Sequence, residues 1–223
     1  MTSLDLLQLV SPALPVGAFS YSEGLEALIQ SCELTDEEGI EQWLIAELQQ
    51  GNLRFEAAAL PQLVADLRRW KVNKDSMARC RLIELDSWLL ANREAAEVRE
   101  QQCQMGGALL QLLVEMNHPL PEQISLSWPA AWAWASTSLQ VPERDMVVGY
   151  LYAWVANQLS AAVRLVPLGP TRAQVLQQRM KPRIITAAEC LSGMTVSELW
   201  SSGVGASMAQ LAHRELYSRL FRS

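Results

Sequence analysis

Few side chains in this sequence are suited to metal binding or acid–base chemistry, and those that are lie far apart. The two histidines are His118 and His213. The four cysteines form no CxxC pair and are Cys32, Cys80, Cys103 and Cys190. Because a zinc site needs three or four ligands, we predict no metal site. A capping or surface position is expected for His118, and a surface position for His213 unless another chain supplies further ligands.

The motifs that accompany common enzymatic chemistry do not occur in the sequence either. There is no GxxxxGK followed by Ser or Thr, so the chain has no phosphate-binding loop of that kind. There is no GxSxG nucleophile motif. The run Asp36-Glu37-Glu38 is typical of the start of a helix, and Asp86 of a solvated helix face. We predict a non-enzymatic protein without catalytic residues or cofactors; an enzyme of unknown chemistry remains an alternative.

Composition favours a folded protein that does not bind nucleic acid. Of the 223 residues, 50% are hydrophobic and 19% are charged, which is typical of a chain with a buried core. The net charge of −6 argues against nucleic acid, whose binding needs concentrated Lys and Arg. Widely spaced cysteines are typical of reduced thiols in a cytoplasm. The start of the chain has Asp5 and no basic residue, unlike a signal peptide.

Apolar residues recur at helical spacing along almost the whole chain, and no run alternates with the period of a strand. We predict a single all-α domain over residues 1–223, with many short-to-medium helices around a central buried helix at residues 142–165. The central stretch is borderline in length for a membrane span. It contains Asn157 and Gln158, which are costly in lipid, so burial within a soluble protein is favoured.

Several helix boundaries are predicted from short sequence patterns. Ser or Thr followed three residues later by Glu matches the capping box at Ser20, Thr35 and Thr195. A helix is expected from about Thr171 towards Pro182, and the last helix from Ala206 to about Phe221.

Eight tryptophans are many for a chain of this length. Large aromatic residues serve both in cores and at interfaces, so self-association is expected. Pro129 suits the first turn of a Trp-rich helix. Within that helix a core position is favoured over a dimer interface for Trp128, Trp132 and Trp134.

Two terminal segments are the candidate partner-binding elements. The first, within residues 1–25, is braced by prolines, uncharged from Ser11 to Ser22, and offers Pro12, Pro15, Phe19 and Tyr21. The second, residues 206–223, ends in Tyr217, Arg219, Leu220, Phe221 and Arg222. Aromatic and Arg side chains are frequent interface anchors. The alternative is a terminal helix packed on its own chain, with arginines that suit its C-terminal dipole.

Three stretches together resemble the urease accessory protein family UreF: "LLQLVSPALPVGAFSYSEGLE", "AAVRLVPLGPTRAQ" and "YSRLFRS". The resemblance implies an all-α protein that forms a homodimer and binds UreD, also called UreH. It also implies recruitment of the GTPase UreG and support of nickel insertion into apo-urease. Both terminal segments would contact UreD. The chain departs from the family pattern at Pro170 and around His213-Arg214-Glu215.

Glu23, Arg172 and His213 are three further candidates for partner binding. A second hypothesis is that the chain regulates GTP hydrolysis by UreG, since an inserted arginine can stabilise the charge that develops in phosphoryl transfer. Arg172, Arg219 and Arg222 are candidates for that arginine. A direct nickel carrier is a further alternative, which the shortage of ligands does not favour.

Overall fold

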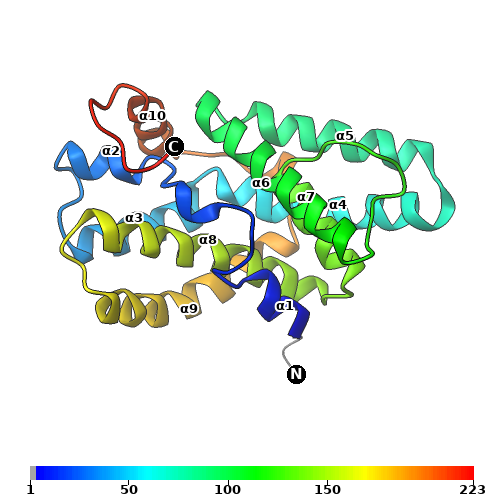
Figure 1. Ribbon diagram of the computed structural model, residues 1–223, viewed down its shortest axis with the longest axis horizontal. Helices are drawn as coiled ribbons and strands as arrows, with labels where there is room; N and C mark the ends of the chain where they lie inside the picture. The colour runs from blue at the N-terminus through cyan, green and yellow to red at the C-terminus, as the bar shows by residue number, and fades with distance from the viewer. Residues whose placement is uncertain (1–3) are drawn as a thin grey trace.

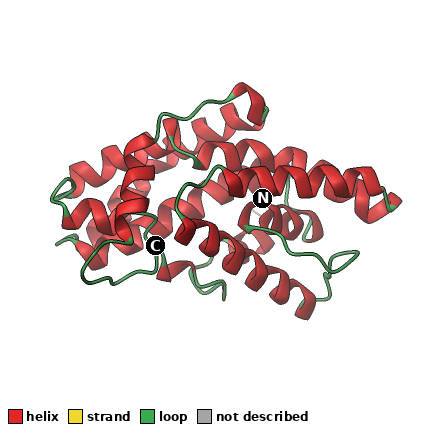
Figure 2. Ribbon diagram, turned by 90° about the horizontal axis from the view of Figure 1, so that it is seen from above, coloured by secondary structure: helices red, strands yellow, loops and turns green. Residues whose placement is uncertain are grey.

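The computed structural model describes residues 4–223 as α-helices joined by loops (Figure 1 and Figure 2). In chain order, with η marking a 3-10 helix, the elements are α1 (Leu4–Leu9), η1 (Ala18–Ser20), α2 (Leu25–Gln30), α3 (Glu37–Gln50), α4 (Leu53–Asn73), α5 (Ser76–Ala91), α6 (Ala96–Glu115), α7 (Trp128–Ser138), α8 (Glu143–Leu165), α9 (Pro170–Ser192), η2 (Val196–Glu198) and α10 (Val204–His213). No strand occurs among these residues, which confirms the predicted all-α fold. Residues 1–3 of the predicted N-terminal segment lie outside the described residues.

Two long helices, α4 and α8, contact most of the others. α4 packs against α5, α7 and α9, while α8 packs against α9, α2 and α1 as well as α4. On α4 the positions that repeat at helical spacing are fully buried, namely Leu60, Leu63 and Leu67. Burial of such apolar side chains stabilises the fold by about 1.5–3 kcal/mol each. The core therefore runs along α4 and α8. The terminal segments pack at its edge, α1 and α2 on α8 and α10 on α2.

α8 is also the one helix within residues 4–223 that is long and apolar enough to span a membrane. About 56% of its most apolar window is buried inside the structure. No residue from 145 to 159 is exposed, because α8 is covered by its neighbouring helices. A core helix of a soluble protein has this same composition. Burial thus accounts for the apolar character of α8.

The Trp-rich helix α7 belongs to the core, as predicted. Trp132 and Trp134 are almost completely buried. Each finds a partner for its indole N–H: Trp132 donates to the main-chain oxygen of Met146 at 3.2 Å, and Trp134 to that of His118 at 3.0 Å. Trp128 is half-buried and its ring lies 5.5 Å from that of Trp132. A core position is confirmed for Trp132 and Trp134.

Some helix boundaries differ from the predicted ones. The capping box at Thr195 is present, on η2. α3 is capped by Asp36, one residue after Thr35, because the Asp36 carboxylate accepts from the Gly39 N–H. α2 starts after Gly24, so the pattern at Ser20 does not cap a helix.

α9 was predicted to end near Pro182, and it continues to Ser192. Proline removes one helical hydrogen bond and strains the preceding turn. Here the buried face of α9, which includes Met180 and Ile184 on either side of Pro182, packs on α8 and holds the helix together.

The last helix is shorter than predicted. α10 ends at His213, and residues 214–223 leave the helix and cross to the start of the chain, as the red loop beside α2 shows in Figure 1. The reason is hydrogen bonding to residues near the start of the chain. The N–H groups of Leu220, Phe221 and Arg222 donate to the Glu26 carboxylate and the Ser20 carbonyl oxygen, so they are not available to a helix.

Candidate partner-binding surface

The N-terminal candidate residues divide into exposed and buried ones. Pro12 and Pro15 are exposed, and the Phe19 side chain is 65% exposed. Tyr21 is only 5% exposed, and its hydroxyl donates to Gln104 Oε1 at 2.7 Å. Tyr21 therefore does not lie on the surface of this structure, since its ring is packed inside the protein, and partner binding by Tyr21 stays a prediction.

The two terminal segments bind each other through main-chain hydrogen bonds. The N–H groups of Ser22 and Glu23 donate to the main-chain oxygen of Ser223 at 2.7 and 3.1 Å. The N–H of Arg222 donates to the carbonyl oxygen of Ser20 at 2.8 Å. We call this arrangement the terminal clasp: residues 20–26 on one side and residues 213–223 on the other.

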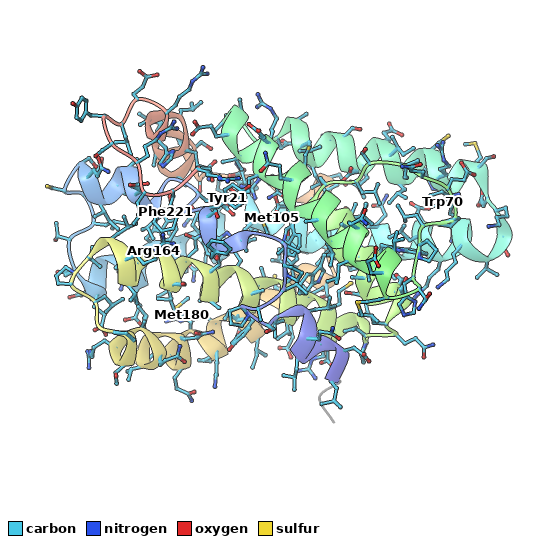
Figure 3. The ribbon with its side chains drawn as sticks, viewed as in Figure 1. Tyr21, Trp70, Met105, Arg164, Met180 and Phe221 are labelled. Atoms are coloured by element: carbon cyan, nitrogen blue, oxygen red, sulfur yellow. The ribbon has the colours of Figure 1, made fainter. Side chains whose placement is uncertain are left out.

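Glu26 is the centre of the clasp. Its carboxylate accepts from the N–H of Leu220 at 2.7 Å, from the N–H of Phe221 at 3.0 Å, and lies 3.1 Å from His213 Nε2. The ring of Phe221 is buried, with the Arg164 guanidinium 4.4 Å from its centroid (Figure 3). The tail is thus packed on its own chain, as in the alternative considered for it, although it is not helical.

The last helix and the tail also carry exposed apolar side chains. On α10, Val204, Met208 and Leu211 are four and three residues apart and lie on one face of the helix. Their side chains are 64%, 64% and 51% exposed. In the tail, Tyr217 is fully exposed and Leu220 about half exposed. Because contiguous exposed apolar patches mark interaction sites, these side chains on α10 and on the tail that follows it are candidates for such a site. We call these five residues the α10–tail surface.

The sequence analysis missed three members of this surface. Val204, Met208 and Leu211 follow the helical period, which was the available signal. Met208 and Leu211 lie within the predicted partner-binding segment of residues 206–223 but were not named, and Val204 precedes Ala206, where the helix was expected to begin. The Gly24 backbone explains how α10 comes so near to α2. A Cβ atom at Gly24 would lie 2.8 Å from the main-chain nitrogen of Gln210, so only glycine allows this approach.

Arg172 does not belong to the clasp. Its guanidinium, on α9, donates to both carboxylate oxygens of Glu37 on α3, at 2.8 and 3.0 Å. Arg179 donates to the same carboxylate and to Glu41. The hydrogen bond from Arg172, followed by that from Arg179, lowers the pKa of Glu37 although partial burial opposes the change. This exposed cluster ties α9 to α3.

Glu23 lies inside the protein, beside a buried ion pair that the sequence analysis did not identify. Its carboxylate accepts from Gln101 Nε2 at 2.8 Å and from Trp154 Nε1 at 3.2 Å. Nearby, Arg93 binds Glu56, and both side chains are almost fully buried. No sequence signal marks this pair, because its members lie 37 residues apart on different elements.

The N-terminal segment also forms one wall of a groove of about 390 Å³. The opposite walls come from α8 and α9, and the lining includes Pro12, Phe19 and Asn157. Among residues 4–223 no group of three or more His, Cys, Asp or Glu side chains is arranged to hold a metal ion. All four cysteines are free and exposed.

These features define an all-α protein whose C-terminal tail is bound to residues 20–26 and whose last helix and tail carry exposed apolar side chains. A family model described as UreF matches residues 34–181. The chain is 37% identical over 218 residues to the urease accessory protein UreF of Prochlorococcus marinus subsp. pastoris (strain CCMP1986), covering 96% of each protein. It is 40% identical over 223 residues to that of Microcystis aeruginosa, covering 99% of the chain and 97% of the relative.

The chain therefore belongs to the UreF family. A relative from Thermosynechococcus vestitus, also named urease accessory protein UreF, is 34% identical and covers 99% of the chain. The family model ends before η2, α10 and the tail, whereas the relatives span them. The predicted resemblance is confirmed.

Proposed function

We propose that this chain is a non-enzymatic scaffold in urease maturation. In this proposal it binds UreD (UreH), helps to recruit the GTPase UreG, and thereby supports nickel insertion into apo-urease in the cytoplasm. The proposal follows from membership in a family whose relatives are named urease accessory proteins. Homodimer formation belongs to the same proposal, and light scattering at high protein concentration tests it. A strictly monomeric chain, alone and with UreD, would contradict it.

The observation that carries the proposal is the α10–tail surface on a tail that is already ordered. The free energy falls when a partner covers apolar side chains that were exposed to water. The clasp holds the tail backbone in one conformation, so docking loses less conformational entropy than docking of a free tail. A surface that is both apolar and pre-ordered suits a lasting protein contact.

The clasp gives the predicted tail residues two different roles. Phe221 is buried, and Arg219 binds Glu97 Oε1 at 2.6 Å, so both act by positioning the tail. Tyr217 and Leu220 face solvent and are proposed to contact UreD directly. Pro12, Pro15 and Phe19, together with the exposed side chain of Arg222, are proposed as a second contact.

The scaffold role is favoured over regulation of UreG by an inserted arginine. Two of the arginines considered for that role, Arg172 and Arg219, are bound to the carboxylates of Glu37 and Glu97. An inserted arginine would have to leave its carboxylate before it could stabilise a phosphoryl group. GTP turnover by UreG, with and without this chain, separates the two roles.

The test compares two methionines of equal exposure. Met208 lies on the α10–tail surface and Met77 on α5, and both are 64% exposed. Met208→Ala and Tyr217→Ala should each weaken binding of purified UreD about thirtyfold if these side chains are hot spots of about 2 kcal/mol. Met77→Ala should leave the dissociation constant unchanged. Equal affinities for all three variants would show that UreD binds elsewhere.

Point substitutions are preferred to removal of the tail. A deletion of residues 219–223 would take the hydrogen-bond donors from Glu26 and uncover the pocket of Phe221. It would therefore disturb the clasp and the surface together. Circular dichroism melting of Met208→Ala and Tyr217→Ala should match the parent chain, because both side chains are exposed.

A further inference from the structure

A small cavity of about 50 Å³ lies next to the groove formed by the N-terminal segment. Its walls come from α4, α6, α7 and α8, together with η1 and the residues between η1 and α2. Met105, one of its apolar lining residues, is labelled in Figure 3. A single water-sized group needs about 10–15 Å³ of such volume. The cavity can therefore hold a few groups of that size.

Oxygen atoms make up much of the polar lining. Glu23 and Glu56 each bring a carboxylate, and their side chains are only 6% and 3% exposed. Gln101 and Gln102 add amide groups, and Tyr150 adds a hydroxyl group. A polar lining of this kind, inside an otherwise apolar core, suits a ligand that binds to oxygen.

One of these oxygens has no partner in the protein. The Gln102 side chain is almost fully buried, and its Nε2 donates to Glu56 Oε1 at 3.2 Å. Among residues 4–223 no group donates to Gln102 Oε1, which is also buried. A buried acceptor without a donor costs free energy. Because Gln102 lines the cavity, a ligand held there can satisfy this oxygen.

The strongest donors on the lining are already engaged. The Tyr150 hydroxyl donates its single hydrogen to Glu56 Oε2 at 2.7 Å. The Trp154 indole donates its single hydrogen to Glu23 Oε2 at 3.2 Å, and Gln101 Nε2 donates to Glu23 Oε1 at 2.8 Å. Lone pairs of the carboxylate, amide and hydroxyl oxygens remain for a ligand. That ligand must therefore donate hydrogen bonds or carry positive charge.

The charges beside the cavity favour a cation over water alone. Two carboxylates line the cavity, and the buried guanidinium of Arg93 binds one of them, Glu56. The other, Glu23, binds the neutral donors Gln101 and Trp154. Buried charge without a counter-charge is unfavourable. One monovalent cation would balance the second carboxylate.

A divalent ion suits the cavity less well. Calcium takes about six to eight oxygen ligands, and magnesium keeps several of its waters. A cavity of about 50 Å³ leaves little room for such a shell. Within residues 4–223 no three His, Cys, Asp or Glu side chains are grouped to hold a metal ion. The chemical class that fits is a compact monovalent cation.

We propose that this cavity binds a compact monovalent cation such as potassium, through the carboxylates of Glu23 and Glu56 and the Oε1 atom of Gln102. We call it the interior cation site. The ion would join the segment before α2 to α4 and α6. The site belongs to this chain alone and goes beyond the scaffold role, because it requires none of the proposed partners.

The outer groove gives the ion a way in. Groove and cavity share four lining residues, which are Ala18, Trp128, Ala153 and Asn157, so the two spaces are adjacent. A small ion can pass between these side chains as they move. Choline, with three methyl groups and a hydroxyethyl arm, is too large for the cavity. It therefore serves as the control cation.

Urea denaturation in potassium chloride tests the proposal, with choline chloride replacing potassium at constant ionic strength. Only the folded chain has the site. Once potassium exceeds its dissociation constant, the equilibrium constant for unfolding should fall about tenfold for each tenfold rise in potassium. An unfolding constant that stays the same from choline to potassium would overturn the proposal.

Two glutamine variants locate the effect. Gln102→Leu removes the unpartnered oxygen and should abolish the potassium dependence. Gln158→Leu is the matched control. Gln158 on α8 is fully buried, and its amide atoms have no hydrogen-bond partner within the described part of the chain, but it does not line the cavity. Its variant should respond to potassium as the parent chain does. A Gln102→Leu chain that keeps the dependence, or a Gln158→Leu chain that loses it, would contradict the assignment.

Anomalous diffraction decides the question even if Gln102→Leu does not fold. Crystals of the parent chain are soaked in thallium(I) acetate, because thallium(I) replaces potassium and scatters anomalously. We expect an anomalous peak between Glu23, Glu56 and Gln102. Density for water without an anomalous peak at this position would overturn the proposal, since the cavity would then hold solvent only.

Discussion

Arg93 offers the sharpest test of how the interior is stabilised. It lies between α5 and α6, and its guanidinium Nε donates to Glu56 Oε1 at 2.9 Å, with both side chains almost fully buried. The hydroxyl of Tyr150 donates to Glu56 Oε2 at 2.7 Å, and Gln102 Nε2 donates to Glu56 Oε1 at 3.2 Å. Burial raises the pKa of Glu56, and Arg93 is the largest influence that lowers it.

We expect Arg93→Met to lower the free energy of unfolding by about 3–5 kcal/mol at pH 8, because a buried carboxylate is left without its cation. Methionine fills much of the same volume, so the loss reports on charge more than on packing. The loss should shrink at pH 5.5. Without Arg93 the folded-state pKa of Glu56 rises further above 4.5, and Glu56 can then take up a proton instead of remaining charged.

Urea denaturation followed by circular dichroism measures this change, at one protein concentration so that self-association does not contribute. The matched control is Arg144→Met, which removes the partner of Glu189 in an ion pair of 2.6 Å whose side chains are 70% and 53% exposed. An exposed pair contributes about 0–1 kcal/mol. If both variants lose the same free energy, or the loss in Arg93→Met does not depend on pH, the reasoning about buried charge is refuted.

Three further predictions use the same measurement. Trp132→Ala should cost about 3–5 kcal/mol, because Trp132 is fully buried, and Trp200→Ala less than about 0.5 kcal/mol, because Trp200 is 75% exposed; equal losses would contradict this. Gly24→Ala should cost about 1–3 kcal/mol, since Gly24 has φ +88° and faces the backbone of α10, whereas Gly205→Ala, with open space around it, should be neutral or stabilising. Burial raises the pKa of Glu47 to about 7. The folded protein therefore holds this proton more tightly than the unfolded chain, and the free energy of unfolding should fall as pH rises from about 4.5 to 7. Glu47→Gln should remove up to about 3 kcal/mol of that pH dependence, and an unchanged profile would refute the assignment.

The class of fold could be predicted from the sequence because helical periodicity is a local property. Thr195 with Glu198, and Pro129 in the first turn of α7, needed only their immediate neighbours to be identified. Pro182 was misjudged because packing of α9 on α8 outweighs the local cost of a proline. Tertiary contact decides such positions, and a pattern within one helix does not record it.

The candidate site was predicted less completely, for the same physical reason. Tyr217 and Leu220 are exposed, as a partner-binding role requires, but Tyr21 and Phe221 are buried. The course of the tail is set by the carboxylate of Glu26, which binds the N–H groups of Leu220 and Phe221 from a point almost 200 residues earlier in the chain. The sequence shows that Glu26 lies among apolar residues. It does not show that Glu26 is buried or which groups bind it.

The interactions that hold the tail differ from those that hold the helices of the core. α4 and α8 are held by apolar burial, which depends little on pH. The tail has one buried apolar ring, Phe221, and is otherwise held by hydrogen bonds and charges centred on Glu26. Regions with few apolar contacts open at lower free energy than the core. The α10–tail surface can therefore be ordered or released without unfolding the helices that carry it. Binding to a partner that requires the ordered tail would then be weakened in proportion to the released fraction.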